Sequence, residues 1–188
     1  TMMSDILRIT KSVKGFHSSA QLHFLESSPE LQNKQNEILA DYEIVHHESL
    51  KTVPSDIPLF FIANEFFDVL PINQFEYNEK KWCERRITYS ESGSFQWALH
   101  DVNIDPTAGL NIPSPKEGQI LEISNEREEF MDELSERVQK QAGAGLAIDY
   151  GYYKSAYGDT FQAVTKHKHV DPLEYIGEAD LTAHVNFG

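Results

Sequence analysis

The sequence has few cysteines, few basic residues and no long apolar run, and each shortage excludes a class of protein. Cys83 is the single cysteine among 188 residues, so no intramolecular disulfide can form. The chain therefore suits a reducing compartment, either a cytoplasm or the mitochondrial matrix. Because Cys83 lies in a charged segment with no base beside it in the sequence, we interpret it as an inert thiol and not as a nucleophile.

Basic side chains are outnumbered by acidic ones. The 16 Lys and Arg residues stand against 30 Asp and Glu residues, which gives a formal net charge of −14. This charge repels phosphate backbones and anionic lipid surfaces, so we do not expect nucleic acid as a partner. It would attract a basic peptide or protein, although we interpret most of the charge as a contribution to solubility.

Long apolar segments are also lacking. A transmembrane helix needs about 18 or more consecutive apolar residues, and the sequence has no such run, so we expect no membrane span. The first residues, TMMSDILRITKSVKGF, do not have the apolar block of a secretory signal and are typical of the body of a helix. The rest of the composition, 40% hydrophobic and 24% charged, indicates one sizeable globular domain.

Helical and strand patterns alternate along the chain. Apolar spacing and capping residues predict helices at residues 3–13, 29–40 and 124–141. Short apolar runs predict strands at residues 21–26, 43–47, 59–63 and 145–149. This alternation predicts an α/β doubly wound sheet. The most hydrophobic run, 59–63, is predicted to be a central parallel strand covered by helices on both faces.

The character of the sequence changes between residues 72 and 117. Alternating segments such as QFEY and RITY are separated by turn-forming residues, which predicts antiparallel hairpins inserted into the sheet's framework. Residues 100–117, which contain three prolines, are predicted to be a connecting loop.

Acidic residues follow the predicted strands, at Glu26, Glu48, Glu65 and Asp149. In an open α/β sheet, ligands bind beyond the carboxyl ends of the strands. A carboxylate at the position of Glu26 is suited to accept both ribose hydroxyls of a nucleoside cofactor, but it is equally suited to complement the dipole of the next helix. Glu48 is a weaker candidate for an adenine amino group.

The segment from Asn64 to Asp68 places two carboxylates and an amide beside aromatic residues. One interpretation is that Glu65 and Asp68 bind a cationic acceptor such as a guanidinium. The alternative is an ordinary helix start in which Asn64 is the cap and Asp68 faces solvent. We expect no metal site, because His167, His169 and His184 lack convincing ligand spacing.

Four separated blocks, in the same order, carry a family resemblance. They are FFIANEFFDVLPINQF, LAIDYGY, SAYGDTFQAVTKHKHVDPL and GEADLTAHVNF. With these blocks the chain resembles the MidA-like methyltransferases, a family that includes the mitochondrial complex I assembly methyltransferase. The resemblance covers residues 1–187. It implies a Rossmann-like class I fold, S-adenosylmethionine as cofactor and a protein substrate. For the mitochondrial member it implies symmetric dimethylation of an arginine on a respiratory complex I subunit.

The resemblance also implies roles for individual residues. The implied cofactor ligands are Glu26, Ser27, Glu48 and Asn64. The implied residues at the methyl-transfer site are Asn64, Glu65 and Asp68. The implied residues on the acceptor side are Asp149, Tyr150, Gly151, Asp159 and Gln162. By the same resemblance the source is a bacterial cytoplasm or the mitochondrial matrix.

One part of the family pattern does not occur in these 188 residues. The first strand and its glycine-rich turn, of the form ELGPGRGT, would precede Thr1, which matches the last threonine of that motif, and a stretch after the HVNF block is also missing. We therefore expect residues 1–188 to be a truncated methyltransferase domain with exposed strand edges, and to bind the cofactor poorly alone. The alternatives are a noncatalytic assembly factor with the same fold and, less favoured, a nucleotide-dependent oxidoreductase. The latter would need a G-x-G-x-x-G fingerprint, which the sequence lacks.

Overall fold

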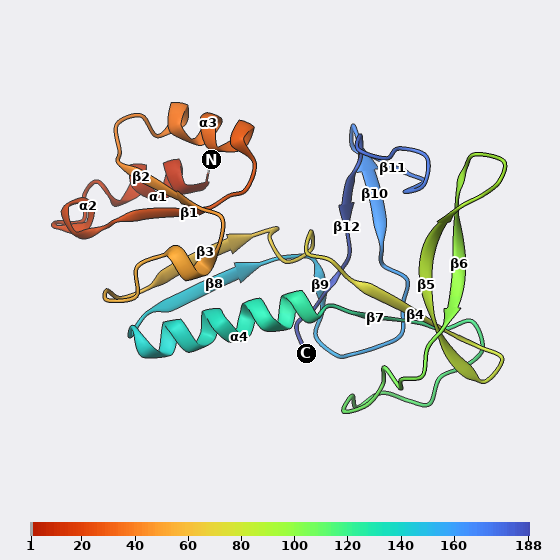
Figure 1. Ribbon diagram of the computed structural model, residues 1–188. Helices are drawn as coiled ribbons and strands as arrows, with labels where there is room; N and C mark the ends of the chain where they lie inside the picture. Colours follow the sequence, from red (N-terminus) through yellow and green to blue (C-terminus); the bar gives the residue numbers. More distant parts are fainter. Residues whose placement is uncertain (1) are drawn as a thin grey trace. The chain divides into compact units, whose positions relative to one another are not determined.

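The computed structural model describes residues 2–188, so the match of Thr1 to the glycine-rich motif lies outside the described residues. The chain divides into two compact units, one that ends at Pro58 and one from Leu59 to Gly188. Each unit is described by itself, with the element labels of Figure 1.

The first unit is a small α/β unit. Its elements are α1 (Met2–Thr10), α2 (Phe16–Ser19), β1 (Leu22–Leu25), α3 (Pro29–Ile38), β2 (Ile44–His47) and the 3-10 helix η1 (Leu50–Thr52). Strands β1 and β2 pair in parallel, with Leu25 opposite His47. The chain leaves α1 earlier than the sequence predicts and turns into α2 at Gly15, whose φ of 84° is accessible to glycine at little cost.

Helix α3 begins where capping rules place it. The Ser28 hydroxyl accepts a hydrogen bond from the Leu31 N–H at 3.4 Å, and Pro29 occupies the first helical turn. Proline suits this position because its fixed φ is helical and its missing N–H would have no helical partner. The strand–helix–strand order predicted for residues 21–47 is confirmed.

The second unit contains one long helix, α4 (Asn125–Lys140), and eleven strands between residues 59 and 188. The strands are β3 (Phe60–Asn64), β4 (Asn73–Asn78), β5 (Lys81–Tyr89), β6 (Phe95–Asp101), β7 (Ile120–Ile123), β8 (Ala144–Ile148), β9 (Gly151–Tyr152), β10 (Gln162–Thr165), β11 (Lys168–Val170), β12 (Asp180–Thr182) and β13 (Val185–Asn186), where β13 closes the unit by pairing with β9.

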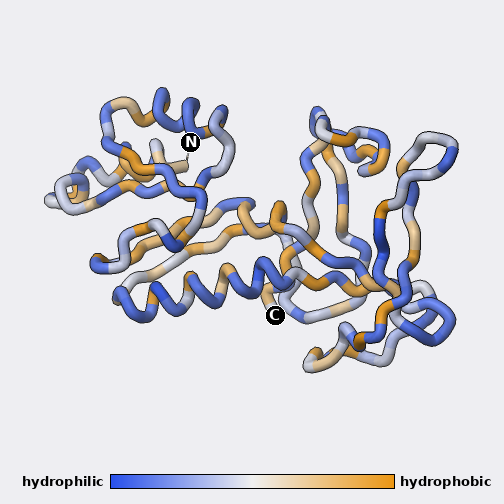
Figure 2. Tube along the Cα trace, viewed as in Figure 1, coloured by the Kyte–Doolittle hydropathy of each residue, from blue (hydrophilic) through white to orange (hydrophobic). Residues whose placement is uncertain are grey.

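Strands β3 and β8 form a parallel pair, with Asn64 opposite Ile148. Helix α4 lies along this pair in Figure 1, on the side of Phe61. A side chain at position 145 would collide with the Phe61 ring, since a Cβ there would lie 1.7 Å from that ring, so Gly145 permits the close contact. Figure 2 shows that both strands are largely hydrophobic.

The prediction that residues 59–63 are covered on both faces is wrong for this unit. The strand's exposure alternates, and Phe60 on the face away from α4 is 74% exposed. Ile62, Leu146 and Ile148 share that face and are also exposed. The physical reason is that α4, the single helix of residues 59–188, covers the Phe61 face alone.

Residues 73–123 form an antiparallel sheet with the strand order β6-β5-β4-β7. Its core consists of Phe75, Trp82 and Leu121. The predicted hairpins are present: β4 and β5 turn at Asn78, and β5 and β6 meet at a turn in which the Ser90 N–H donates to the Ser94 carbonyl at 2.8 Å. Strand β7 was not predicted. It has only four residues and follows a long irregular loop, so its apolar pattern was too short to recognise.

Cys83 is buried in this sheet. Burial raises the pKa of its thiol, and the nearby Asp101 carboxylate adds to the rise. A thiol with a raised pKa is a poor nucleophile, in agreement with its interpretation as inert.

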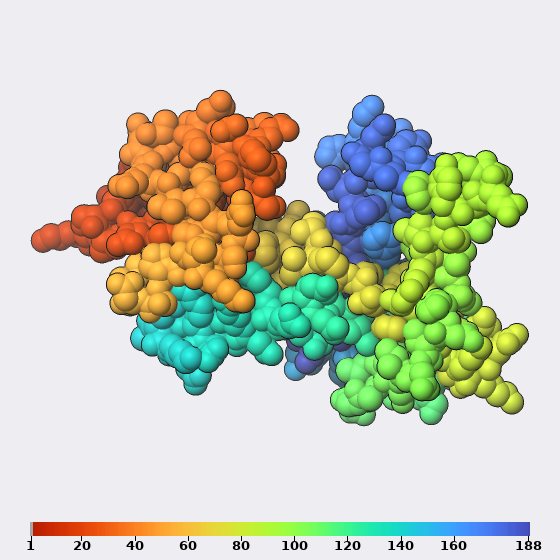
Figure 3. Space-filling model, viewed as in Figure 1, coloured from red at the N-terminus to blue at the C-terminus, as the bar shows by residue number. Residues whose placement is uncertain are grey.

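The remaining strands of the second unit are short. Strand β10 pairs with both β11 and β12, and β9 pairs in parallel with β13. Along residues 2–188, none of the helices combines the length and the apolar character that a bilayer crossing requires. Figure 3 shows the residues of α4 at the surface of the second unit.

Candidate functional site

The carboxyl ends of β1 and β2 form the candidate rim of the first unit. Because the strands are parallel and in register, the residues that follow them emerge at the same edge. The Glu26 N–H donates to the His47 carbonyl at 3.1 Å, which extends the pairing by one bond. The structure therefore places Glu26 and Glu48 at one rim, as the sequence predicts.

The Glu26 carboxylate contacts α3 at its N-cap and in its second half. Its Oε1 accepts from the Ser28 N–H at 2.9 Å, and its Oε2 accepts from the Gln35 side chain at 3.3 Å. The helix-start interpretation of Glu26 is thus realised. Each carboxylate oxygen accepts up to two hydrogen bonds, so each keeps a free acceptor position for a hydroxyl donor. The donor chemistry of a ribose fits this half-buried carboxylate, while Ser27 and Glu48 are exposed beside it.

A histidine pair behind this rim was not singled out from the sequence. His23 Nδ1 lies 2.8 Å from His47 Nε2, and His47 Nδ1 lies 2.8 Å from the Thr52 hydroxyl. Burial lowers the pKa of His23, and the neighbouring His47 lowers it further. The pair could have been found by aligning the two predicted strands in parallel, because that register sets His23 beside the strand that contains His47.

The carboxyl ends of β3 and β8 form the candidate rim of the second unit. Asn64 ends β3 opposite Ile148, and the Glu65 N–H donates to the Ile148 carbonyl at 2.9 Å. Asn64 and Glu65 are both exposed. Glu65 has a φ of 48°, a left-handed conformation that is uncommon for a residue other than glycine and that occurs often at functional sites.

Asp68 differs from both of its neighbours in the motif because it is buried. Its exposed fraction is 7%, and its Oδ1 has no hydrogen-bond partner among the described residues. The alternative interpretation, a helix start with Asp68 facing solvent, is wrong, since residues 65–70 form bends and turns. The chain folds this way because Asp149 binds the amides that a helix start would leave free.

Burial raises the pKa of the Asp68 carboxyl, and the negative charges of Asp149 and Glu65 raise it further. The Val69 amide and the Arg127 guanidinium act in the opposite direction and are weaker. The Asp68 carboxyl is therefore more readily protonated than an exposed aspartate. A buried acceptor without a donor is costly unless a proton or a ligand satisfies it.

Asp149 follows β8 and binds backbone amides. Its Oδ2 accepts from the Phe67 N–H at 2.9 Å and from the Asp68 N–H at 3.2 Å, and its Oδ1 accepts from the Tyr150 N–H at 2.8 Å. Tyr150 is exposed, and Gly151 pairs with Val185. Asp149 thus joins the two strand ends, while its contact with an acceptor stays a prediction.

Arg127 is a second residue of this region that sequence reasoning missed. It extends from α4, and its guanidinium donates to four backbone carbonyl oxygens. Those carbonyls belong to Phe67, Asp68, Ala183 and His184. An arginine in the first turn of a helix opposes the helix dipole, and that unusual placement was the available sequence signal.

Asp159 and Gln162 make polar contacts of their own within the second unit. The Gln74 amide donates to Asp159 Oδ1 and to Glu122 Oε1, both at 2.8 Å, and Arg85 donates to Asp159 Oδ2 at 2.8 Å. The Gln162 amide donates to the Thr182 hydroxyl at 3.0 Å. Both predicted acceptor-side residues are therefore engaged within the second unit, although the Asp159 side chain stays 45% exposed.

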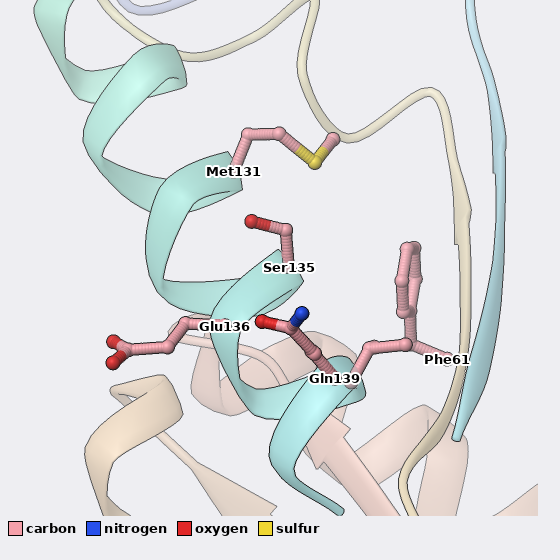
Figure 4. A pocket seen from close by; sticks show the side chains of 6 residues that line it. Phe61, Met131, Ser135, Glu136 and Gln139 are labelled. Carbon is pink, nitrogen blue, oxygen red and sulfur yellow. The ribbon is translucent and has the colours of Figure 1, made fainter. Parts of the chain in front are cut away.

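An open hollow of about 540 Å³ lies between β3 and α4. Figure 4 shows Phe61 facing the α4 side chains Met131, Ser135 and Gln139 across it. None of the predicted site residues lines this hollow. Among residues 2–188 no group of three or more His, Cys, Asp or Glu side chains is arranged to hold a metal ion.

A family model described as "Putative S-adenosyl-L-methionine-dependent methyltransferase" matches residues 1–188. The chain belongs to this methyltransferase family. Among its curated relatives is the Drosophila melanogaster protein named protein arginine methyltransferase NDUFAF7 homolog, mitochondrial, which is 31% identical over 215 residues. The Danio rerio protein arginine methyltransferase NDUFAF7, mitochondrial, is 29% identical over 214 residues. Both alignments cover 100% of this chain but 48% and 50% of the relatives, so the chain spans about half of their length.

The methyltransferase family likeness extends to solved structures. A Burkholderia thailandensis protein has a TM-score of 0.72, with 22% identity over 89% of this chain and 47% of that chain. A second Burkholderia thailandensis structure, bound to S-adenosyl-homocysteine, has a TM-score of 0.71 at the same identity and covers 46% of that chain. These likenesses show that the chain shares its α/β fold, with mixed sheets, with both proteins.

Proposed function

We propose that residues 1–188 form part of an S-adenosylmethionine-dependent methyltransferase that modifies an arginine of a protein substrate. Membership of the methyltransferase family and the names of the curated relatives support this proposal. The observation that carries it is the Glu26 carboxylate at a strand end, with one free acceptor position on each oxygen. A subunit of respiratory complex I is the substrate that the resemblance implies.

The proposal includes a finer description of the fold. Within its own unit, each of the parallel pairs β1–β2 and β3–β8 has a Rossmann-like arrangement, and residues 72–117 are a hairpin insertion. Two observations support it: both pairs are parallel, and one face of β3 and β8 remains exposed although parallel strands are normally covered on both faces. The mitochondrial names of the relatives favour the matrix, and the bacterial neighbours favour a bacterial cytoplasm.

In the proposed mechanism the residues of this chain bind and align. Glu26 and Ser27 would hold the ribose of the cofactor, Glu48 would accept from its adenine amino group, and Asn64 would contribute a further polar contact. S-adenosylmethionine, when bound, supplies an activated methyl group. Glu65 holds the acceptor guanidinium with its exposed carboxylate, which suits the paired N–H groups of arginine. Alignment of the acceptor accounts for most of the catalytic task in a displacement of this kind.

The proposed acceptor side consists of Asp149, Tyr150, Gly151, Asp159 and Gln162, whereas Asp68 belongs with Asn64 and Glu65 at the proposed methyl-transfer site. For Asp68 the structure adds a constraint: because its carboxylate is buried, it acts on the acceptor through the loop conformation and Glu65. A guanidinium donor would satisfy its buried Oδ1. This makes Glu65 the first residue to test.

The test uses the full-length protein, labelled S-adenosylmethionine and an extract from cells that lack the enzyme. We expect label in dimethylarginine of a specific protein. Glu26→Gln should weaken binding of S-adenosyl-homocysteine by about tenfold or more, the loss that follows from one charged hydrogen bond. Glu30→Gln is the matched control, since Glu30 is an exposed acid four residues away that pairs with Lys34.

Glu65→Gln should lower methyl transfer by about tenfold or more without weakening cofactor binding. Glu129→Gln, an exposed acid on α4, is its control. Unchanged methylation by Glu65→Gln would remove Glu65 from the mechanism. Cofactor binding without any transfer to protein would instead favour a noncatalytic assembly factor.

A further inference from the structure

The loop between β3 and β4 is held by an arginine from another element. Arg127 Nε donates to the Phe67 carbonyl at 2.7 Å, and Nη2 donates to the Asp68 carbonyl at 3.1 Å. The same guanidinium binds the Ala183 carbonyl at 2.9 Å and the His184 carbonyl at 2.8 Å. Arg127 therefore joins the loop to the segment between β12 and β13.

These four acceptors are unusual for a half-buried arginine, because none of them is a carboxylate. A guanidinium presents its N–H groups in a rigid planar fork, so it fixes the mutual geometry of every carbonyl that it binds. Its burial is compensated at a distance by the charges of Asp149, Glu122 and Asp68. The arrangement specifies a backbone conformation more than it forms an ion pair.

Asp149 holds the same loop through its amides. The Phe67 and Asp68 N–H groups both donate to Asp149 Oδ2. The same two peptide positions therefore have their N–H groups fixed by an anion after β8 and their carbonyls fixed by a cation on α4. One further bond, from the Ala183 N–H to the Asp68 carbonyl at 2.9 Å, strengthens the junction.

The backbone positions that Arg127 and Asp149 bind come shortly after Glu65, whose own backbone is strained. Glu65 has a φ of 48°, which costs about 1 kcal/mol or more for a residue with a side chain and persists where the surroundings fix it. Two residues later the backbone is bound on both sides by Asp149 and Arg127. The exposed Glu65 carboxylate is thus presented by a loop with little freedom of its own.

We propose that Arg127 and Asp149 are positioning residues that clamp the backbone at Phe67 and Asp68 and thereby fix the direction of the Glu65 carboxylate for its acceptor. The inference rests on the proposed function, because it assigns a purpose to the clamp through Glu65. It adds a specificity device: a guanidinium-sized acceptor is selected by where the loop places Glu65 as well as by its charge.

The experiment compares Arg127→Met with Arg137→Met in the full-length protein. Arg137 lies on the same helix and donates to Gln141 within the helix's own end, so its replacement removes the same kind of side chain outside the clamp. The first readout is amide hydrogen exchange. The Phe67 and Asp68 amides should exchange about tenfold faster or more in Arg127→Met, while amides of the β4–β5 hairpin should not change.

The second readout is enzymatic. With extract from cells that lack the enzyme as the source of acceptor, Arg127→Met should raise the apparent KM for the acceptor by about tenfold or more. Its affinity for S-adenosyl-homocysteine should stay within about twofold of the wild type, a split that general unfolding would not produce. Arg127→Lys should fall between the two, because an ammonium donates from a single point and cannot reach both segments.

Asp149→Asn is the second variant, and it should accelerate exchange at the same two amides. Unchanged exchange in Arg127→Met and Asp149→Asn would overturn the inference whatever the activity. Faster exchange with unchanged acceptor kinetics would also overturn it, since the loop would then be clamped for no effect on Glu65. A wild-type protein that transfers no methyl group would fail the proposed function, and the exchange data would still report whether the clamp exists.

Discussion

The rim of the first unit and the rim of the second are built with contacts of different sequence range. Glu26 is bound by residues two and nine positions away, which are the N-cap of α3 and a residue in its second half. Asp149 is bound by amides 82 and 81 positions away. The first rim therefore forms together with its own helix, whereas the second requires that distant segments of the chain have already come together.

The dependence of the second unit on distant segments can be tested most directly at Gly151, where β9 approaches β13. A Cβ at this position would lie 2.0 Å from the Val185 carbonyl oxygen, so Gly151→Ala forces β9 and β13 apart. We expect a loss of about 3 kcal/mol in the free energy of unfolding, measured by urea denaturation of the full-length protein. In Gly158→Ala the added Cβ meets the Thr160 methyl group at 3.7 Å, and this control should change little. Equal losses in the two variants would contradict the close approach.

Two serine caps, one in each unit, should differ in how much stability their removal costs, with smaller losses than at Gly151. The Ser28 hydroxyl accepts from the Leu31 N–H of its own helix. The Ser124 hydroxyl accepts from the Arg127 N–H and also donates to the Pro71 carbonyl at 2.5 Å. Ser28→Ala should cost about 0.5 kcal/mol and Ser124→Ala about 2 kcal/mol, because the second removes a long-range bond in addition to a cap.

Segment-resolved hydrogen exchange of both serine variants measures these losses. Destabilisation should stay within residues 22–47 for Ser28→Ala and should reach residues 65–71 for Ser124→Ala. A local response in both variants would mean that the Ser124 bond to Pro71 contributes nothing.

The smallest effects concern pH, for which the two units should respond with opposite sign. The pKa of His23 is lowered from 6.5, so its contribution to stability is complete above pH 6.5 and is lost as the pH falls through the lowered pKa. The pKa of Asp68 is raised from 3.8, so its contribution is complete below pH 3.8 and is lost as the pH rises through the raised pKa.

Two variants, one in each unit, test these opposite pH dependences. At neutral pH Asp68→Asn should stabilise residues 59–188 relative to the wild type and flatten their pH dependence above pH 3.8. His23→Gln should flatten the dependence of the first unit below pH 6.5. Exchange rates corrected for the intrinsic effect of pH report both, and a destabilising Asp68→Asn would show that the buried carboxylate has a partner in solution.

The difference in sequence range also explains what the sequence could predict. The parallel strands, the cap of α3, the cap of α4 and the acids at strand ends follow from local periodicity and capping chemistry, and the structure contains them. The left-handed Glu65 could not be predicted, since its conformation depends on Asp149 and Ile148, more than eighty residues away. Arg127 was missed for the same reason, because its four acceptors lie about sixty residues away on both sides along the chain.

Burial was the property that sequence reasoning judged worst. The apolar run at residues 59–63 indicated a strand covered on both sides, yet Phe60 is exposed. One of the two interpretations of Asp68 was a solvent-facing side chain at a helix start, yet Asp68 is buried. Burial depends on which other segments arrive at a surface, and single-chain periodicity contains no record of that. The residue-by-residue assignment of cofactor and acceptor contacts stays a prediction.

The uncovered face of β3 and β8 has a practical consequence for anyone who purifies these 188 residues. An apolar, solvent-exposed strip is formed there by Phe60, Ile62, Leu146 and Ile148. Such strips promote aggregation as the protein is concentrated. The net charge of −14 opposes aggregation because the protein molecules repel one another, and salt weakens that repulsion. Dilute, low-salt buffers should therefore keep preparations clear longest.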